Sequence, residues 1–218
     1  MRSKAIESYK TQLRLNADQK EILIGILLGD ATLETQNNGR TYRMKIEHSI
    51  SQKHYLEHLY LVFKDWVLSQ PRLRKVVLPN GKTYINVAFS TLSHPSFRFY
   101  AHQFYRGRIK VVPRLIYKWL TPRAFAYWFM DDGSIKSKQS KGVILNTQGF
   151  SKQDVLRLVK AVESVFNLEA KARKQKEGYQ IYISGRSYER FKDLVLPHIL
   201  PEMTYKIPEA RRTYLPKL

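Results

Sequence analysis

Two apolar stretches decide the fold of this chain: Leu-Ile-Gly-Ile-Leu-Leu-Gly-Asp-Ala at residues 23–31 and Phe-Ala-Tyr-Trp-Phe-Met-Asp-Asp-Gly at residues 125–133. Each predicts a short helix that is apolar on nearly every side, which is typical of a helix buried in a protein core. Asn16 precedes the first helix, and Thr121 with Pro122 gives the second an N-cap and a first-turn proline. Two such helices in matching contexts predict an internal repeat.

The sequence after each apolar stretch supports this repeat. A short strand, an amphipathic helix opened by a serine N-cap, a basic hairpin and a further helix follow in the same order in both halves. In the first half they are residues 42–48, 51–63, 73–78 with 83–91, and 95–105; in the second they are 143–148, 151–162, 168–175 with 179–184, and 188–195. We predict an α+β fold of two pseudo-symmetric αββαββα-type halves, 1–107 and 108–218, that form one compact unit.

The composition indicates a polyanionic partner. The chain has 218 residues, and its 38 Lys and Arg against 18 Asp and Glu give a net charge of +20. Because the 43% hydrophobic content is that of a folded protein, this charge is expected on a folded surface. The absence of cysteine excludes disulfides and thiolate chemistry. The longest apolar run, residues 22–28, is too short to span a membrane, and the first residues lack the apolar centre of a secretory signal.

Two carboxylates end the apolar helices, Asp30 in the first half and Asp132 in the second. A carboxylate at a helix C-terminus meets the negative end of the helix dipole, so two together call for a cation. Hard Mg²⁺ suits oxygen ligands of this kind. Gly25 and Gly29 let two helices approach closely, and we expect the two helices to pack so that both carboxylates emerge at one end. The alternative interpretation is that the two carboxylates are simply exposed to solvent and bind no cation.

A lysine followed closely by proline stands near the end of each half, Lys110 before Pro113 and Lys206 before Pro208. A lysine near a metal-bound water or a phosphate can stabilise developing negative charge. A solvated surface charge is the alternative, and only the repeat favours a functional role.

The basic hairpins are the predicted DNA-binding surfaces, because a two-stranded ribbon fits the major groove. Arg72 and Arg74 are expected on one face of the first ribbon, and Lys171 and Arg173 on one face of the second; a solvated sheet face is the alternative. The full set of expected DNA contacts is Arg43, Lys45, Arg72, Arg74, Lys75, Lys171, Arg173, Lys174 and Tyr182.

Two short motifs lead to no function. Residues 54–58 match the zinc-peptidase pattern H-x-x-E-H, but the repeat places them on an ordinary amphipathic helix. Residues 80–83 resemble the end of a phosphate-binding loop, but Val76 stands where its first glycine is required, so a hairpin turn is predicted.

The two apolar stretches resemble the two copies of the LAGLIDADG motif, and the whole chain is similar to the single-chain, two-motif LAGLIDADG homing endonucleases. Residues 120–122, 145–148 and 205–208 add to this resemblance. It implies that Asp30 and Asp132 bind divalent metal, with the carbonyls of Gly29 and Asp131 as further ligands. It also implies that Lys110 and Lys206 organise catalytic water, and that Glu47 and Gln148 line the water network. Tyr127 departs from the small residue usual in the motif, so unequal packing of the two helices is expected.

The resemblance implies a monomeric, site-specific endonuclease that cuts both strands of a long duplex DNA with Mg²⁺ or Mn²⁺. Its antiparallel sheets would form a DNA-binding saddle, its cuts would leave 3′ overhangs, and it would promote intron mobility in a mitochondrion or chloroplast. An intron-RNA maturase or another non-catalytic nucleic-acid binder on the same fold is the alternative, with intron RNA as the partner. A basic ribosomal or RNA-packing protein has no reason to keep the two carboxylates. No membrane partner is expected.

Overall fold

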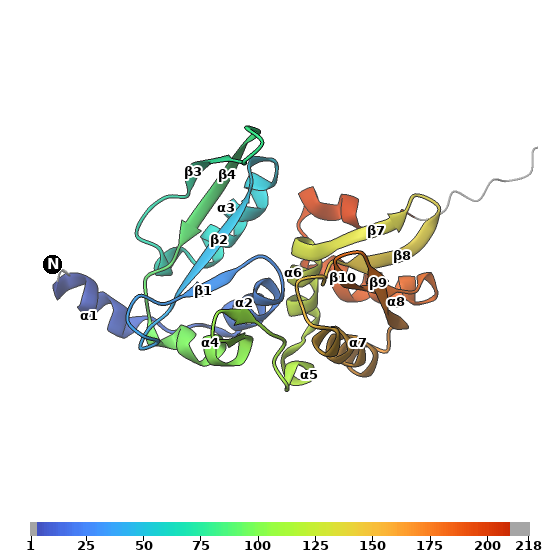
Figure 1. The fold of residues 1–218 in the computed structure, drawn as a ribbon. Coiled ribbons are helices and arrows are strands. Elements are labelled where there is room, and N and C mark those ends of the chain that lie inside the picture. Colours follow the sequence, from blue (N-terminus) through green and yellow to red (C-terminus); the bar gives the residue numbers. More distant parts are fainter. Residues whose placement is uncertain (1–3, 210–218) are drawn as a thin grey trace, which may run out of the picture. The chain divides into compact units, whose positions relative to one another are not determined.

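The computed structural model describes residues 4–209, which divide into two compact units with the boundary between Pro113 and Arg114 (Figure 1). The sequence analysis set this boundary after Gly107. Gly107, at φ +61°, lies in the turn of a short hairpin, and Tyr105 pairs there with Lys110. This pairing keeps residues 108–113 in unit 1.

Unit 1 is built around a four-stranded antiparallel sheet of order β1-β2-β4-β3. Its elements are α1 (Lys4–Gln12), α2 (Ala17–Leu28), β1 (Thr32–Glu34), β2 (Arg43–Ser49), α3 (Lys53–Val62), β3 (Arg72–Val77), β4 (Thr83–Ser90), α4 (Arg98–Phe104), β5 (Tyr105–Arg106) and β6 (Ile109–Lys110). Short 3-10 helices cover Ile50–Gln52, Lys64–Trp66 and Pro95–Phe97.

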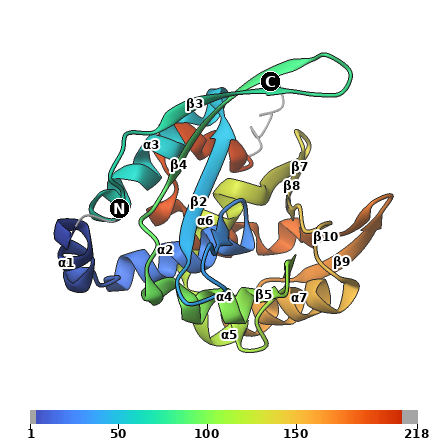
Figure 2. The same cartoon turned by 60° about the vertical axis from the view of Figure 1, so that its left-hand side comes forward.

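Unit 2 repeats this order around a second antiparallel sheet, β7-β8-β10-β9 (Figure 2). Its elements are α5 (Ile116–Trp119), α6 (Pro122–Asp132), β7 (Gly133–Ser137), β8 (Ser140–Leu145), α7 (Lys152–Phe166), β9 (Ala170–Gln175), β10 (Gly178–Ile183) and α8 (Tyr188–Val195). Short 3-10 helices cover Gly185–Ser187, Leu196–His198 and Pro201–Lys206. The predicted α+β repeat of two αββαββα halves is confirmed, with α1 and α5 standing before the repeat.

The two apolar helices begin as their sequences predict. Asn16 and Gln19 form a capping box at the start of α2, in which each side chain bonds the backbone of the other. Thr121 accepts from the backbone N–H of Ala124 at the start of α6, and Pro122 stands at its first position. Both helices are buried over most of their length, as expected for helices that are apolar on every side.

Each sheet has one buried face and one open face. On β2 the buried residues are Met44, Ile46 and His48, and α3 packs against β2 and β4 with Tyr55, Leu56 and Leu59. In unit 2, α7 packs in the same way against β9 and β10. Because successive strand residues point to opposite faces, the residues between the buried ones stand on the open faces.

Within residues 4–209, no helix combines the length and the apolar character that a membrane span requires.

Candidate functional site

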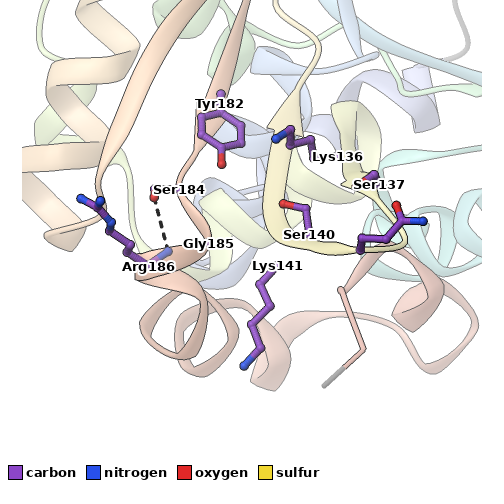
Figure 3. A pocket seen from close by; sticks show the side chains of 9 residues that line it. Lys136, Ser137, Ser140, Lys141, Tyr182, Ser184, Gly185 and Arg186 are labelled. Atoms are coloured by element: carbon purple, nitrogen blue, oxygen red, sulfur yellow. Dashed lines mark hydrogen bonds between the residues drawn. The ribbon is translucent and has the colours of Figure 1, made fainter. Parts of the chain in front are cut away.

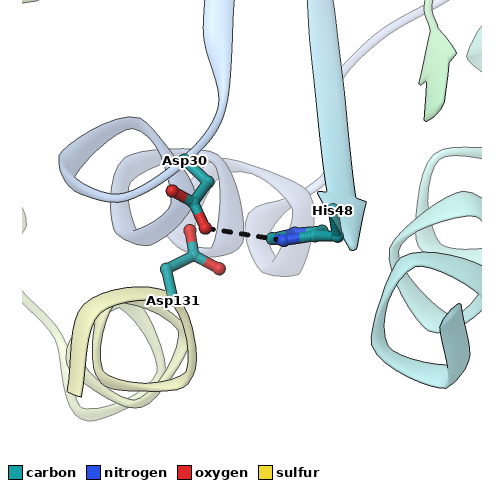
Figure 4. Close-up of side chains that lie close together, drawn as sticks. All are labelled: Asp30, His48 and Asp131. Atoms are coloured by element: carbon teal, nitrogen blue, oxygen red, sulfur yellow. Dashed lines mark ion pairs between the residues drawn. The ribbon is translucent and has the colours of Figure 1, made fainter. Parts of the chain in front are cut away.

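In unit 1 the site is built at the end of α2, where Gly29 caps the helix and Asp30 follows it. The Asp30 side chain is 46% exposed, and one of its oxygens lies 3.5 Å from Nδ1 of the buried His48 on β2 (Figure 4). Sequence reasoning did not single out His48. Its alternation with Met44 and Ile46 predicts only that it is buried.

Lys110 lies directly against this helix end. Its Nζ donates to the Gly29 carbonyl at 2.6 Å and to the Ala31 carbonyl at 2.9 Å. The last carbonyls of a helix carry its negative partial charge, so an ammonium group here stabilises the helix end. The structure thus brings Lys110 to the backbone on both sides of Asp30.

Unit 2 holds the same combination at the end of α6. Lys206, the last residue of its 3-10 helix and only 9% exposed, donates through Nζ to the Met130 carbonyl and, at 3.2 Å, to the Asp131 carbonyl. Trp128, one turn earlier, donates from its indole nitrogen to a carboxylate oxygen of Asp132 at 3.3 Å. Each lysine therefore binds the carbonyl that immediately precedes the predicted metal-binding Asp.

Strand register shows which residues correspond between the units. Thr32 lies opposite Lys45 and Gly133 opposite Leu145. When the two registers are continued backwards to the helix ends, Asp30 falls opposite Glu47 and Asp132 falls opposite Asn146. Asn146 donates to the Asp132 carbonyl from its backbone and from its side chain, both at 3.0 Å.

Asn146, rather than Gln148, therefore corresponds to Glu47. Gln148 stands two residues later, in the turn before α7, and its carbonyl is packed against Gly178. Sequence reasoning did not single out Asn146, because Glu47 follows its Asp by more residues than Asn146 does, and only the strand registers reveal the correspondence. The water-network role of Gln148 stays a prediction.

Glu47 lies on the open face of the unit 1 sheet among three donors. Its carboxylate accepts from Asn86 at 3.0 Å and Arg74 at 2.6 Å, and it lies 3.2 Å from Lys45. The hydrogen bond from Asn86 is the largest cause that lowers the pKa of Glu47, and the Lys45 and Arg74 charges act in the same direction. Glu47 is thus ionised at neutral pH.

The open face of the unit 1 sheet carries most of the predicted DNA-binding residues of this half. Arg72 lies opposite Ala88, which lies opposite Glu47, and Arg74 lies opposite Asn86. Arg43 and Lys45 alternate with buried residues of β2 and share this face, where Arg43 pairs with Glu34 at 2.9 Å. Lys75 points to the other face, because it lies one residue from Arg74.

The second sheet shows the same division. Lys171 lies directly opposite Tyr182, and Arg173 lies opposite Gln180, so all four stand on the open face. Lys174 is exposed but lies on the opposite face of β9.

Comparisons with known proteins agree with this architecture. Residues 20–191 match the model of the LAGLIDADG DNA endonuclease family. The "Probable intron-encoded endonuclease 1" of Wickerhamomyces canadensis is 35% identical over 211 residues, with 94% of this chain and 90% of the relative covered. The "Cytochrome b mRNA maturase bI2" of Debaryomyces hansenii is 29% identical over 198 residues, with 88% of this chain and 74% of the relative covered.

Solved structures give the same picture. The homing endonuclease I-WcaI bound to its DNA recognition sequence superposes with a TM-score of 0.90 at 33% identity, covering 96% of this chain and 95% of that one. I-DmoI in complex with DNA and Mn shares the fold, with a TM-score of 0.51 at 17% identity, covering 83% of this chain and 97% of that one.

Proposed function

This chain belongs to the LAGLIDADG DNA endonuclease family, and we propose that within it the protein is an intron-encoded, site-specific homing endonuclease. It hydrolyses one phosphodiester bond in each strand of a long duplex target, leaves 3′ overhangs and thereby promotes intron mobility. The observation that carries the proposal is the duplicated arrangement of an Asp after a buried helix with a lysine on the carbonyl before it.

The residues present fit a divalent metal ion. Asp30 offers a carboxylate that is nearly half exposed, Asp132 offers a second, and the neighbouring backbone offers carbonyl oxygens. Oxygen ligands suit Mg²⁺ and Mn²⁺. We assign Asp30 and Asp132 to metal binding, with the Gly29 and Asp131 carbonyls, which also accept from the lysines, as further ligands. When bound, the ion supplies Lewis acidity and a water molecule of lowered pKa.

The lysines hold positive charge beside the reacting phosphate. Because Nζ of Lys110 and of Lys206 is fixed by two backbone carbonyls, each ammonium group is already oriented before DNA arrives. Preorganised charge of this kind stabilises the negative charge that develops on phosphate oxygens during hydrolysis. Glu47 is ionised at neutral pH, and we assign it to the catalytic water network of unit 1. Asn146 takes the corresponding place in unit 2 and carries no charge.

The open faces of the two sheets bind the duplex. Arg side chains there can pair with guanine edges, while Lys side chains more often meet phosphates. The net charge of +20 supports binding to an extended polyanion such as a long duplex recognition site.

Single carboxylate substitutions test the proposal. Asp30→Asn and Asp132→Asn are expected to abolish double-strand cleavage of a plasmid that carries the intron-less host gene in Mg²⁺. Binding to the same DNA without metal should be nearly unchanged, since each substitution removes a metal ligand rather than a DNA contact. Asp193→Asn, which changes an exposed carboxylate on α8, is the matched control and should cleave normally. Linear product from both site variants would contradict the assignment.

A second activity has its own support. The Debaryomyces hansenii relative is named an mRNA maturase, and the alignment spans most of this chain. We therefore propose intron RNA as the alternative partner. Enhanced splicing of the host intron by a protein that fails to cleave the intron-less gene would favour the maturase. We also propose that the protein works in an organelle, because a relative from Oryza sativa is named chloroplastic.

A further inference from the structure

Each of the two carboxylates assigned to metal binding meets a buried donor, and the two donors come from different places in the fold. In unit 1, Nδ1 of His48 lies 3.5 Å from an oxygen of Asp30 (Figure 4). In unit 2, the indole N–H of Trp128 donates to an oxygen of Asp132 at 3.3 Å. Neither His48 nor Trp128 takes part in the chemistry assigned to the carboxylates and the lysines.

His48 reaches Asp30 from the sheet. It stands on β2, where it pairs with Val87 of β4, and its side chain is only 2% exposed. The Tyr55 ring of α3 lies against the imidazole, with 5.0 Å between the ring centres. Because strand pairing fixes its backbone and an aromatic neighbour packs on its ring, His48 has little freedom to turn. It therefore offers a rigid contact to a carboxylate that is nearly half exposed to solvent.

Trp128 reaches Asp132 along its own helix. The two residues are four apart on α6, and residues at this spacing lie on the same side of a helix. The Trp128 side chain is fully buried, and its ring packs edge to face against Phe125 with 6.1 Å between the ring centres. A buried indole N–H usually finds a hydrogen-bond acceptor, and here the acceptor is the carboxylate assigned to metal binding.

The His48 position carries a different residue in unit 2. The strand registers that align Asn146 with Glu47 also align Thr147 with His48. Thr147 is buried like His48, but its hydroxyl donates to the Tyr179 carbonyl at 2.8 Å. Unit 2 therefore uses this position to satisfy the backbone of its own sheet rather than to reach the carboxylate.

The Trp128 position likewise differs in unit 1. Ile26 stands four residues before Asp30, as Trp128 stands four residues before Asp132. The buried side chain of Ile26 has no polar atom, so α2 cannot supply the donor that α6 supplies. The two differences are complementary, because the half without the indole has the imidazole and the half without the imidazole has the indole. This exchange within the repeat indicates that both halves need a donor beside the carboxylate.

A donor of this kind affects how well a carboxylate binds a metal ion. Groups that contact a metal ligand hold it in the orientation that the ion requires, and their loss typically costs about 10–100-fold in metal affinity or activity. A carboxylate can accept at both of its oxygens, so a contact to one oxygen leaves capacity for a cation. Without the contact, an exposed Asp side chain loses more rotamer freedom when the ion binds, which weakens binding.

We propose that His48 and Trp128 are positioning residues: His48 orients the Asp30 carboxylate, and Trp128 orients the Asp132 carboxylate, for the metal ion. The proposal rests on the proposed function and deepens it, because it makes the two halves unequal. One carboxylate is held from the sheet and the other from its own helix. Since each half carries its own Asp and its own lysine, each donor should matter most for the cleavage of one DNA strand.

The first test follows each strand separately, on a target duplex from the intron-less gene that carries a different fluorescent label on each strand. With Mg²⁺ and excess protein, His48→Leu should slow the cleavage of one strand about tenfold more than that of the other. Trp128→Phe keeps an aromatic ring without the N–H and should show the opposite bias. His48→Gln keeps a donor and should recover most of the lost rate. No bias, or the same bias in His48→Leu and Trp128→Phe, would overturn the positioning role, because a merely structural defect acts on both strands alike.

The second test needs no cleavage. The affinity for the same duplex is measured as Ca²⁺ is added, because Ca²⁺ also takes oxygen ligands. His48→Leu and Trp128→Phe should each need about tenfold more Ca²⁺ for the half-maximal gain in affinity. Ser137→Ala is the matched control and should behave like the wild type, since Ser137 lies at the far end of β7 from Asp132, in the wall of a pocket of about 590 Å³ (Figure 3). No Ca²⁺ effect on the wild type, or an unchanged midpoint in both variants, would refute the proposal.

The two tests together distinguish this proposal from the proposed function. If the wild type cleaves no DNA but both variants shift the Ca²⁺ midpoint, the positioning role stands and the endonuclease proposal fails. If the wild type cleaves its target while the Ca²⁺ midpoint and the ratio of the two strand rates are unchanged in both variants, the endonuclease proposal stands and the positioning role is refuted.

Discussion

Replacement of Lys206 by methionine tests two roles of the lysines. One is to stabilise the carbonyls at the helix ends, and the other is the proposed role in catalysis. Methionine keeps the unbranched stem and its packing but removes the ammonium group, which donates to the Met130 and Asp131 carbonyls. Lys206 is 9% exposed, so water cannot readily replace these bonds. A buried acceptor left without its donor costs about 1–3 kcal/mol, and loss of a cation at a helix C-terminus costs roughly 0.3–1 kcal/mol more.

We therefore expect Lys206→Met to lower the free energy of unfolding by about 2 kcal/mol, which comes mainly from the unpaired carbonyls. For a chain of this length the melting temperature should fall by about 2–4 °C for each kcal/mol. Thermal and urea unfolding, followed by circular dichroism, measure the change. Lys110→Met is the matched comparison: Lys110 is only partly buried, so water can reach its carbonyls and the loss should be smaller.

If the two lysines act as proposed, both variants should lose plasmid cleavage, because each then lacks a positive charge beside the reacting phosphate. A Lys206→Met protein as stable as the wild type would refute the structural part of this reasoning. Full cleavage by either variant would refute the catalytic part.

Three further outcomes are expected. Asn16→Ala removes the N-cap of α2 and should cost about 1 kcal/mol of stability, measured by urea unfolding. Burial lowers the pKa of His94 below its ordinary 6.5, and its Nδ1 accepts from the Ser96 N–H; the neutral ring therefore stabilises the fold above about pH 6.5, and stability is lost as the pH falls below it. Melting at pH 7.5 and pH 5 should accordingly differ more for the wild type than for His94→Gln. Gly133→Ala should destabilise unit 2 and reduce cleavage, because the new Cβ would lie 2.3 Å from the Phe129 carbonyl oxygen; an alanine variant that melts and cleaves normally would contradict this.

The sequence predicted the repeat well, because its signals are local. The apolar helices, their N-caps and the hairpin turn at Asn80-Gly81 all depend on residues near one another in the chain. Gly81 adopts φ +79°, as the turn requires. The same local signals placed Asp30 and Asp132 at the ends of α2 and α6.

Features that depend on strand pairing were harder to predict. The correspondence of Asn146 with Glu47 follows from the register of two strand pairs, and spacing from the motif alone pointed to Gln148 instead. Lys75 and Lys174 are among the expected DNA contacts, yet strand pleating places each on the sheet face opposite to that of the neighbouring arginine. The placement of Lys171 opposite Tyr182 depends on the register of β9 with β10, so composition alone cannot show it.

The lysine at each helix end also determines whether the fold needs the proposed metal ion. An ammonium group already satisfies the carbonyls that end α2 and α6, so neither helix needs an ion to complete it. The fold therefore does not depend on the proposed metal ion, unlike that of small domains that fold only when they bind zinc. If the protein cleaves DNA with metal as proposed, a newly made chain could fold and search DNA without cutting it, and cleavage would begin only when target and ion are present together.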